Sequence, residues 1–248
     1  MNFAVIGSGG REHAICYKLK QSKKIGKLIC IPGNAGTKKI AKNIEEDITN
    51  FNLMYKIIKN EEIHIVVVGP EQPLVDGLVD FLRERKVLVF GPDKFASQLE
   101  GSKAFMKDLC KKNSIPTANY GVFSNLNEAE NFINKSETPI VVKADGLAAG
   151  KGVTICNSIN EAKEKTKEIL NGKFKSSKKV VLEEFLEGEE LSYFVIADKN
   201  SYNFFGSAQD HKRVGENDTG PNTGGMGAYS PAKLLTSSLE EKIKKKII

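Results

Sequence analysis

The first third of the chain alternates short apolar runs with longer amphipathic segments. The apolar runs lie at residues 3–6, 28–31, 63–68 and 87–90. Short apolar runs of this kind are typical of parallel strands buried on both faces, and the segments between them are long enough for helices. The pattern predicts a parallel α/β domain over residues 1–92. Ligands bind at the carboxyl ends of such strands, where glycine-rich and polar turns follow here.

The rest of the chain changes its pattern three times. Residues 93–117 are predicted to form a connecting helix and strap, because Pro92 and Asp93 favour a helix start and Ile115-Pro116 favours its end. Residues 118–190 are predicted to form a small α+β subdomain. Residues 191–248 begin a further subdomain with an antiparallel pair at 191–197 and 202–206.

Within these two subdomains, further elements are predicted from local periodicity and turn residues. They are a helix at 126–134, a strand ending at Lys143, a charged helix at 159–170, an apolar strand at 180–182, a long glycine-rich loop at 213–227 and a helix at 237–248. A loop of that length is usually functional or disordered, and we interpret it as functional.

A lysine and a glycine-rich turn form the most informative motif. Lys143 ends an apolar strand, and residues 146–152 read Gly-Leu-Ala-Ala-Gly-Lys-Gly. Glycines let backbone N–H groups approach anionic oxygens, and a lysine supplies the compensating charge. The turn is not a Walker A loop, because Lys151 is followed by Gly152 and not by a hydroxyl residue. The motif indicates a different nucleotide-binding fold.

The run from Val180 to Glu190 has the residue types that an adenine nucleoside needs. Phe185 and Leu186 can form an apolar wall, and the carboxylate of Glu190 can accept hydrogen bonds from both ribose hydroxyls. Taken alone, the run favours a solvated, acidic surface segment. Its position after the lysine and the glycine turn favours a nucleotide site.

A dinucleotide-binding domain is the natural rival for the first domain. Gly7-Ser8-Gly9-Gly10 supplies the first two glycines of that fingerprint, but the sixth position is Glu12. The acidic residue expected after the second strand is replaced by Pro32-Gly33-Asn34. These departures disfavour NAD. A helix start after Gly9 still favours a monophosphate.

Composition and charge fit an enzyme of small metabolites. The formal charge of +6 is modest and the lysines are mixed with acidic residues, so nucleic acid is not an expected partner. No run approaches the roughly 18 apolar residues of a membrane span, and no signal peptide is evident. The cytoplasm is expected. Four widely spaced cysteines predict reduced, buried thiols, and His64 and His211 are interpreted as a core residue and a loop hydrogen-bonding residue.

Further segments extend the motif: residues 4–14, 32–37, 68–74, 209–213 and 220–227. With the lysine and glycine turn, they make the chain from Met1 to about Pro231 resemble the ATP-grasp superfamily, and within it the glycinamide ribonucleotide synthetase family. The resemblance implies a pre-ATP-grasp parallel domain followed by an α+β ATP-grasp domain. It also implies a monomeric enzyme of purine biosynthesis that joins glycine to 5-phosphoribosylamine. ATP would first convert glycine into an acyl phosphate, without a nucleophilic side chain.

The resemblance also assigns roles to residues. ATP would be held by Lys103, Lys143, Gly150, Lys151, Gly152, Glu183, Glu184, Phe185, Leu186 and Glu190. The substrates would be held by Gly9, Gly10, Arg11, Asn34, Glu71, Asp210, Asp218, Asn222, Thr223, Gly224 and Gly225. Lys143, Asp210 and Lys212 would be the catalytic residues. Glu71 is alternatively a turn carboxylate, and His13 is alternatively a structural residue of a first helical turn.

One departure from the family concerns its metal. The family holds magnesium with a glutamate and a later Glu-x-Asn pair, and no such pair follows Gly227. No metal ligand is therefore assigned, and the ligands of Mg or Mn are expected beyond residue 248. We interpret the chain as an amino-terminal portion that binds ATP without completing the reaction. A non-catalytic nucleotide- and phosphoribosyl-binding fragment, or a related ATP-grasp carboxylase that takes bicarbonate, are the alternatives.

Overall fold

The structure is a computed structural model that describes residues 1–148, 151–174, 177–216 and 219–248. By internal contacts it divides into two compact units. The first unit comprises Met1–Met106 and Asp145–Leu147, and the second comprises Lys107–Ala144 and Ala148–Ile248. Within the described ranges, no helix is both long and apolar enough to cross a membrane.

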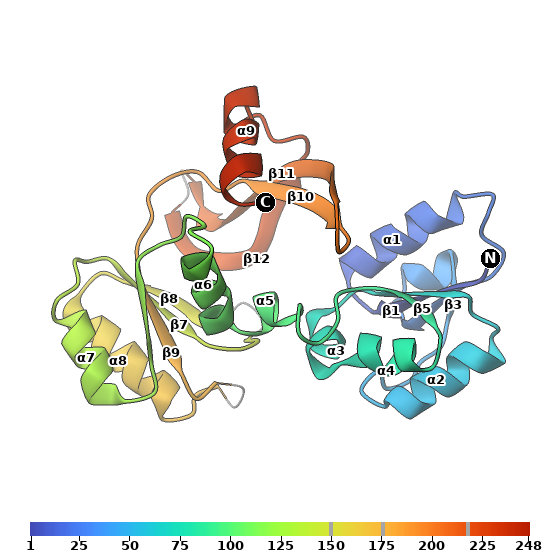
Figure 1. The fold of residues 1–248 in the computed structure, drawn as a ribbon, viewed down its shortest axis with the longest axis horizontal. Helices are drawn as coiled ribbons and strands as arrows, with labels where there is room; N and C mark the ends of the chain where they lie inside the picture. The colour runs from blue at the N-terminus through green and yellow to red at the C-terminus, as the bar shows by residue number, and fades with distance from the viewer. Residues whose placement is uncertain (149–150, 175–176, 217–218) are drawn as a thin grey trace. The chain divides into compact units, whose positions relative to one another are not determined.

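The first unit contains a five-stranded parallel sheet with the order β3-β2-β1-β4-β5. Figure 1 labels β1, β3 and β5 of this sheet. Its strands are β1 (Phe3–Gly7), β2 (Leu28–Pro32), β3 (Lys42–Asn43), β4 (Ile65–Val68) and β5 (Leu88–Phe90). Its helices are α1 (Gly10–Lys20), the 3-10 turn η1 (Thr37–Lys39), α2 (Phe51–Asn60), α3 (Glu71–Asp76), α4 (Leu78–Glu84) and α5 (Gln98–Gly101). The parallel α/β domain predicted from the apolar runs is confirmed.

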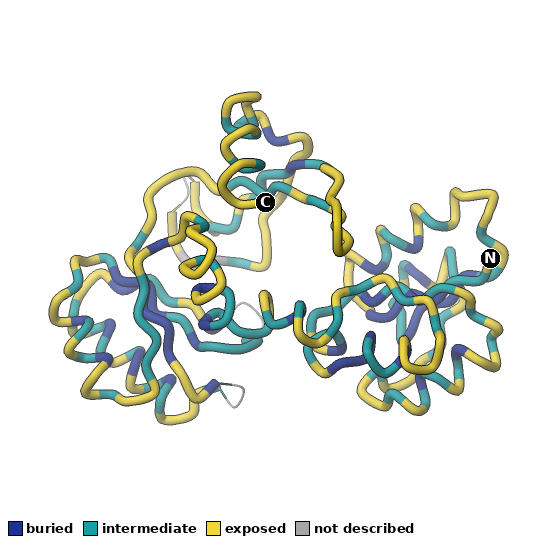
Figure 2. The backbone as a smooth tube through the Cα atoms, in the orientation of Figure 1, coloured by how far each residue is buried: buried dark blue, intermediate teal, exposed yellow. Residues whose placement is uncertain are grey.

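Both faces of the central strands are buried, as the apolar runs predicted (Figure 2). Ala4 and Ile6 pack into one core cluster with residues of α2 and α4, whereas Val5 packs on the opposite face with Cys16 and Cys30. The edge strand β5 departs from that pattern, because Leu88 is 66% exposed. An edge strand has a neighbour on one side only, and the chain pattern alone could not place this strand at the edge.

The second unit begins with a four-stranded antiparallel sheet of order β6-β9-β7-β8. Its strands are β6 (Tyr120–Phe123), β7 (Ile140–Ala144), β8 (Val153–Cys156) and β9 (Val180–Glu184). Two helices, α7 (Leu126–Ile133) and α8 (Ile159–Leu170), lie together on one face of this sheet (Figure 1). They bury Ile140, Val142 and Leu182, so the alternate positions of β7 and β9 face the other way.

A second sheet of order β10-β11-β12 completes this unit, with helix α9 (Ser237–Lys246) after it. Its strands are β10 (Ser192–Ala197), β11 (Tyr202–Gly215) and β12 (Thr219–Tyr229). The prediction of an irregular loop over residues 213–227 is therefore wrong for most of its length. In the described residues, β11 and β12 pair antiparallel, and their register shifts after His211 and again after Arg213. Such irregular pairing has no period that a sequence pattern could detect.

The connecting segment also differs from its prediction. Pro92-Asp93 does not start a helix; the side chain of Asp93 accepts a hydrogen bond from Ala96 N at 2.7 Å and holds a turn. Helix α5 begins at Gln98, and Ser102, in an extended conformation, separates it from α6 (Lys103–Lys112).

Candidate functional site

In the first unit, the turns that follow β1 and β2 are tied together by the side chain of Asn34. Its Nδ2 donates to the carbonyl oxygens of Ser8 at 2.9 Å and Gly9 at 3.2 Å. Its Oδ1 accepts from the backbone N–H groups of Gly36 at 2.8 Å and Thr37 at 2.9 Å. Asn34 was predicted to contact a substrate. Here its amide group fixes the shape of the glycine turn, and a ligand would have to replace one of these bonds.

Glu12 is a buried residue of this cluster that sequence reasoning used only as an argument against NAD. It is 3% exposed, and its Oε2 accepts from Gly9 N at 2.5 Å. A Cβ atom would lie 2.7 Å from Glu12 Cδ if built at Gly7, and 2.0 Å from Oε1 if built at Gly69. The glycines therefore make room for a carboxylate. Glutamate three residues after a helix start is a common capping signal, and this could have identified it.

Arg11 of α1 and Glu71, the first residue of α3, form an ion pair. Arg11 Nη2 lies 2.6 Å from Glu71 Oε1, and the arginine side chain is 69% exposed. The hydrogen bond from Arg11 holds the pKa of the Glu71 carboxyl below its usual range. Both residues were predicted separately as substrate contacts, and the structure brings them together. Gly9 and Gly10 lie at the start of α1, where an added Cβ at Gly10 would meet nothing within 4 Å.

The two histidines near this sheet have different surroundings. The half-buried His13 lies against the Asn34 turn, because a Cβ built at Gly36 would be 3.1 Å from its Nε2. His64 was predicted to be a core residue, and this is wrong. It is exposed just before β4, and its Nδ1 accepts a hydrogen bond from Asn2 N at 3.1 Å.

In the second unit, Lys143 of β7 and Glu183 of β9 lie on the sheet face opposite α7 and α8. Val141 is directly across from Glu183, and Lys143 is directly across from Val181, so the lysine and the glutamate are diagonal neighbours. Lys143 Nζ lies 2.9 Å from Glu183 Oε2. Glu183 is buried, whereas the Lys143 side chain is 24% exposed. The lysine is thus the member of this pair that a ligand can reach.

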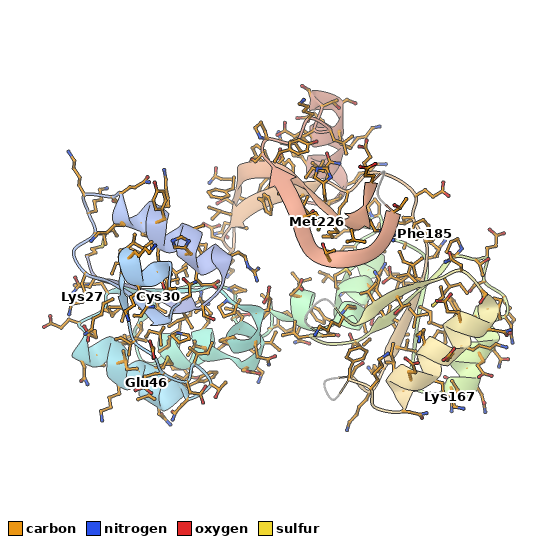
Figure 3. All side chains as sticks on the ribbon, turned by 180° about the vertical axis from the view of Figure 1, so that it is seen from behind. Lys27, Cys30, Glu46, Lys167, Phe185 and Met226 are labelled. Carbon is orange, nitrogen blue, oxygen red and sulfur yellow. The ribbon has the colours of Figure 1, made fainter. Side chains whose placement is uncertain are left out.

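A cavity of about 710 Å³ opens on the same face. Ile155 of β8 lines it, and Ile155 is paired with Val141, which shares the face of Lys143 and Glu183. The segment after β9 contributes Phe185, Leu186 and Glu190 to its wall, and the β11–β12 hairpin contributes residues that include Met226; Figure 3 labels Phe185 and Met226. Lys143 and Glu183 themselves do not line it.

Lys212 lines this cavity and forms ion pairs with two carboxylates. Its Nζ lies 2.5 Å from Glu190 Oε1 and 3.7 Å from Asp210 Oδ2. The hydrogen bond to Glu190 raises the pKa of the Lys212 ammonium. The structure therefore brings together three residues that were predicted to bind or act on different ligands. His211 lies in β11, not in a loop, and its ring stacks on Tyr229.

Hydrogen bonds with residues 102–104 hold the start of the lysine and glycine turn. Lys103 Nζ donates to the Gly146 carbonyl at 2.9 Å, and the carboxylate of Asp145 accepts from Ser102 Oγ at 3.1 Å and from Ala104 N at 3.1 Å. Sequence reasoning missed Asp145 as the residue that caps α6. Close packing explains why position 152 is a glycine, because a Cβ there would lie 2.6 Å from Ala148 Cβ.

For the remaining predicted site residues, the structure shows only exposure and local contacts. Lys151 is exposed, and Glu184 is exposed and accepts hydrogen bonds from the backbone and side chain of Asn119. Thr223 Oγ1 accepts from Gly225 N at 3.0 Å, and a Cβ at Gly224 or Gly225 would meet nothing within 4 Å. Gly150 and Asp218 lie outside the described residues, as does the side chain of Asn222.

The fold and the lysine-bearing sheet define the class of this protein. Residues 101–248 match the family described as phosphoribosylglycinamide synthetase, ATP-grasp (A) domain, which makes the chain an ATP-grasp protein. Residues 1–100 match the N domain of the same synthetase. The chain belongs to the phosphoribosylglycinamide synthetase family.

Individual relatives agree with this family. The chain is 48% identical over 249 residues to a phosphoribosylamine–glycine ligase of Mesorhizobium japonicum and 47% identical over 252 residues to one of Haemophilus influenzae. A solved phosphoribosylamine–glycine ligase from Thermotoga maritima is 36% identical, with a TM-score of 0.84 over 99% of this chain. The chain spans 59% of the length of each of these three relatives.

Proposed function

We propose that this chain binds ATP on the lysine-bearing face of its second unit and takes part in the ligation of glycine to 5-phosphoribosylamine. The products are glycinamide ribonucleotide, ADP and phosphate, as in purine biosynthesis. The observation that carries the proposal is the position of Lys143, the reachable cation of a buried ion pair, on the same sheet face as a cavity walled by Phe185 and Leu186.

The residues of this face fit the parts of ATP. Phe185 and Leu186 offer apolar surface to the adenine, and Glu190 offers two acceptor oxygens to the ribose. Lys143 supplies charge to the phosphates, and Lys103, Lys151 and the glycine turn are proposed to add N–H groups. Lys212 forms ion pairs with Glu190 and Asp210. A nucleotide that binds Glu190 would release Lys212 from that carboxylate, so the lysine could then pair with Asp210 and with the phosphates.

ATP supplies the γ-phosphoryl group that turns the glycine carboxylate into an acyl phosphate with a good leaving group. Phosphoryl transfer depends mainly on positioning and on stabilisation of negative charge. Lys143 and Lys212 are suited to both tasks. The amine of 5-phosphoribosylamine then attacks the glycyl carbonyl and phosphate leaves. Asp210, Asp218, Asn222, Thr223, Gly224 and Gly225 are proposed to position glycine.

Magnesium does not fit the described residues. Across residues 1–148, 151–174, 177–216 and 219–248, no group of three His, Cys, Asp or Glu side chains could hold a metal ion. Lys143 and Lys212 are also cationic, and each faces a carboxylate that is already paired with it.

The first unit is proposed to hold the phosphoribosyl group. The start of α1 has open space in front of Gly10, where a Cβ would meet nothing within 4 Å, and helix N-termini favour phosphate. Gly9 N donates to Glu12, so Gly10 is the better placed of the two glycines to receive a phosphate. Arg11 is exposed enough to add a cation, and its partner Glu71 is proposed to meet sugar hydroxyls. A monomeric state and the lack of nucleic-acid and membrane partners stay predictions.

Calorimetry and a turnover assay test this proposal together. ATP should bind residues 1–248 with one site, and the longest natural polypeptide that contains them should release ADP only when glycine and 5-phosphoribosylamine are both present. Bicarbonate in place of glycine tests the carboxylase alternative. Absence of ATP binding would refute the proposed nucleotide site. ADP release that follows bicarbonate and not glycine would replace the ligase with the carboxylase.

A further inference from the structure

Lys107 of α6 is a buried lysine for which neither the sequence motifs nor the proposed function has a role. It is 2% exposed. Its Nζ donates to Thr117 Oγ1 at 2.7 Å and to the Ala118 carbonyl at 3.4 Å, and lies 2.9 Å from Glu183 Oε2. An ammonium group carries three donor hydrogens. The three partners use all of them, so Lys107 has no donor left for a ligand.

Lys107 and Lys143 share one carboxylate oxygen. Each Nζ lies 2.9 Å from Glu183 Oε2, while Oε1 of Glu183 is buried without a partner among the described residues. Lys143 differs from Lys107 in two respects. Its side chain is 24% exposed against 3%, and Glu183 is its one partner in the described part of the chain.

The second lysine changes the charge of the cluster. Lys143 and Glu183 alone would make a neutral pair, in which the buried carboxylate competes with any phosphate for the lysine. With Lys107 the cluster has two ammonium groups and one carboxylate, a net charge of +1 where water is largely excluded. Charge interactions are strong in such surroundings. The two ammonium groups also repel each other across the shared oxygen, so the net hold on Lys143 is weaker.

We propose that Lys107 is a positioning residue for nucleotide binding: by holding Glu183 it leaves the charge of Lys143 available to the phosphates of ATP. The inference rests on the proposed nucleotide site and adds a residue that does not touch the ligand. It predicts an effect that grows with the number of phosphates. A purely structural role for Lys107 would instead weaken adenosine and ATP alike.

The test compares ATP, ADP, AMP and adenosine as ligands of residues 1–248, by calorimetry and ligand-observed nuclear magnetic resonance. Lys107→Met should weaken ATP about tenfold, ADP and AMP progressively less, and adenosine less than about twofold. Lys111→Met removes one exposed positive charge from the same helix and should change none of these affinities. Circular dichroism melting confirms that each variant is folded.

Two further variants test whether Lys107 affects ATP binding through Glu183. In Lys107→Met/Glu183→Gln the competing carboxylate is removed together with its partner, so ATP affinity should return to within about threefold of the unmodified chain. Glu183→Gln alone should bind ATP more tightly, with adenosine unchanged. This variant decides the matter if Lys107→Met does not fold: weaker or unchanged ATP binding would then overturn the inference.

The outcomes separate this inference from the function on which it rests. Equal losses for adenosine and ATP in Lys107→Met would make Lys107 a structural residue only. Loss of ATP binding in Lys143→Met with no change in Lys107→Met would overturn the inference and leave the nucleotide site standing. An unmodified chain that binds none of the four ligands would overturn both.

Discussion

Gly69 and Glu12 occupy adjoining space so tightly that a Cβ atom on Gly69 would lie 2.0 Å from Oε1 of the glutamate. Glu12 belongs to the first turn of helix α1 and Gly69 follows β4, so the contact joins a helix start to the segment after a neighbouring strand, at the carboxyl ends of the parallel strands. The carboxylate is buried, and its Oε2 holds Gly9 N. The glycine after β4 is therefore required by a neighbouring side chain and not by its own backbone angles.

Gly69→Ala should destabilise the first unit, because a methyl group forced against a buried carboxylate displaces it from Gly9. Overpacking of this kind costs about 1–3 kcal/mol, and urea unfolding measures it. Gly10→Ala is the matched control, because a Cβ there would meet nothing within 4 Å. Equal stability of the two variants would show that Glu12 can move aside without loss.

Lys143→Met should weaken ATP binding while leaving the melting temperature nearly unchanged. A charge-assisted contact to phosphate contributes about 1.5–3 kcal/mol, and Glu183 keeps its ion pair with Lys107 when Lys143 is removed. Calorimetry measures the dissociation constant. Lys167→Met is the control, since Lys167 is an exposed lysine of α8, on the other face of the same sheet (Figure 3). Unchanged ATP affinity in Lys143→Met would remove this lysine from the site.

Phe185→Ala should weaken adenosine and ATP by similar factors, because Phe185 contributes apolar surface to the cavity and no charge. Loss of most of an aromatic contact corresponds to roughly tenfold in affinity or more. Phe194→Ala is the control, because Phe194 is a 47% exposed phenylalanine of β10 that does not line the cavity. A loss confined to ATP, with adenosine unaffected, would contradict an adenine contact.

Stability should depend on pH through Glu61. Hydrogen bonds from Lys42 and then Lys27 lower the pKa of the Glu61 carboxyl from its ordinary value of 4.5. A lowered folded-state pKa means that the stabilisation is present above pH 4.5 and is lost as the pH falls through the folded value. Glu61→Gln should therefore lower the urea midpoint near neutral pH and make little difference in acid.

The control for this prediction is Glu46→Gln. Glu46 is an exposed glutamate of the same unit that forms no ion pair within the described residues (Figure 3). Its urea midpoint should differ little from that of the unmodified chain at every pH. A Glu61→Gln effect that persists undiminished in acid would show that packing, and not ionisation, is responsible.

The sequence predicted the elements whose period is regular. The buried strands around Ala4, Ile29 and Val66 follow from continuous apolar runs, and α8 (Ile159–Leu170) begins and ends where its pattern does. It also predicted Lys143 and Phe185 as ligand contacts, because both stand in local motifs: a strand end before glycines, and an apolar pair after a strand. These properties depend on neighbours in the chain, which a sequence displays directly.

Only the tertiary structure decided the partners of those residues. Glu183 looked like part of an acidic run, yet it is buried because the register of β7 and β9 turns it toward Lys143 and because α6 brings Lys107 to the same oxygen. Lys107 and Glu183 are separated by 76 residues, so no periodicity along the chain relates them. Buried charges such as these are stable only when they are paired with one another. The three groups come together only after the sheet has formed.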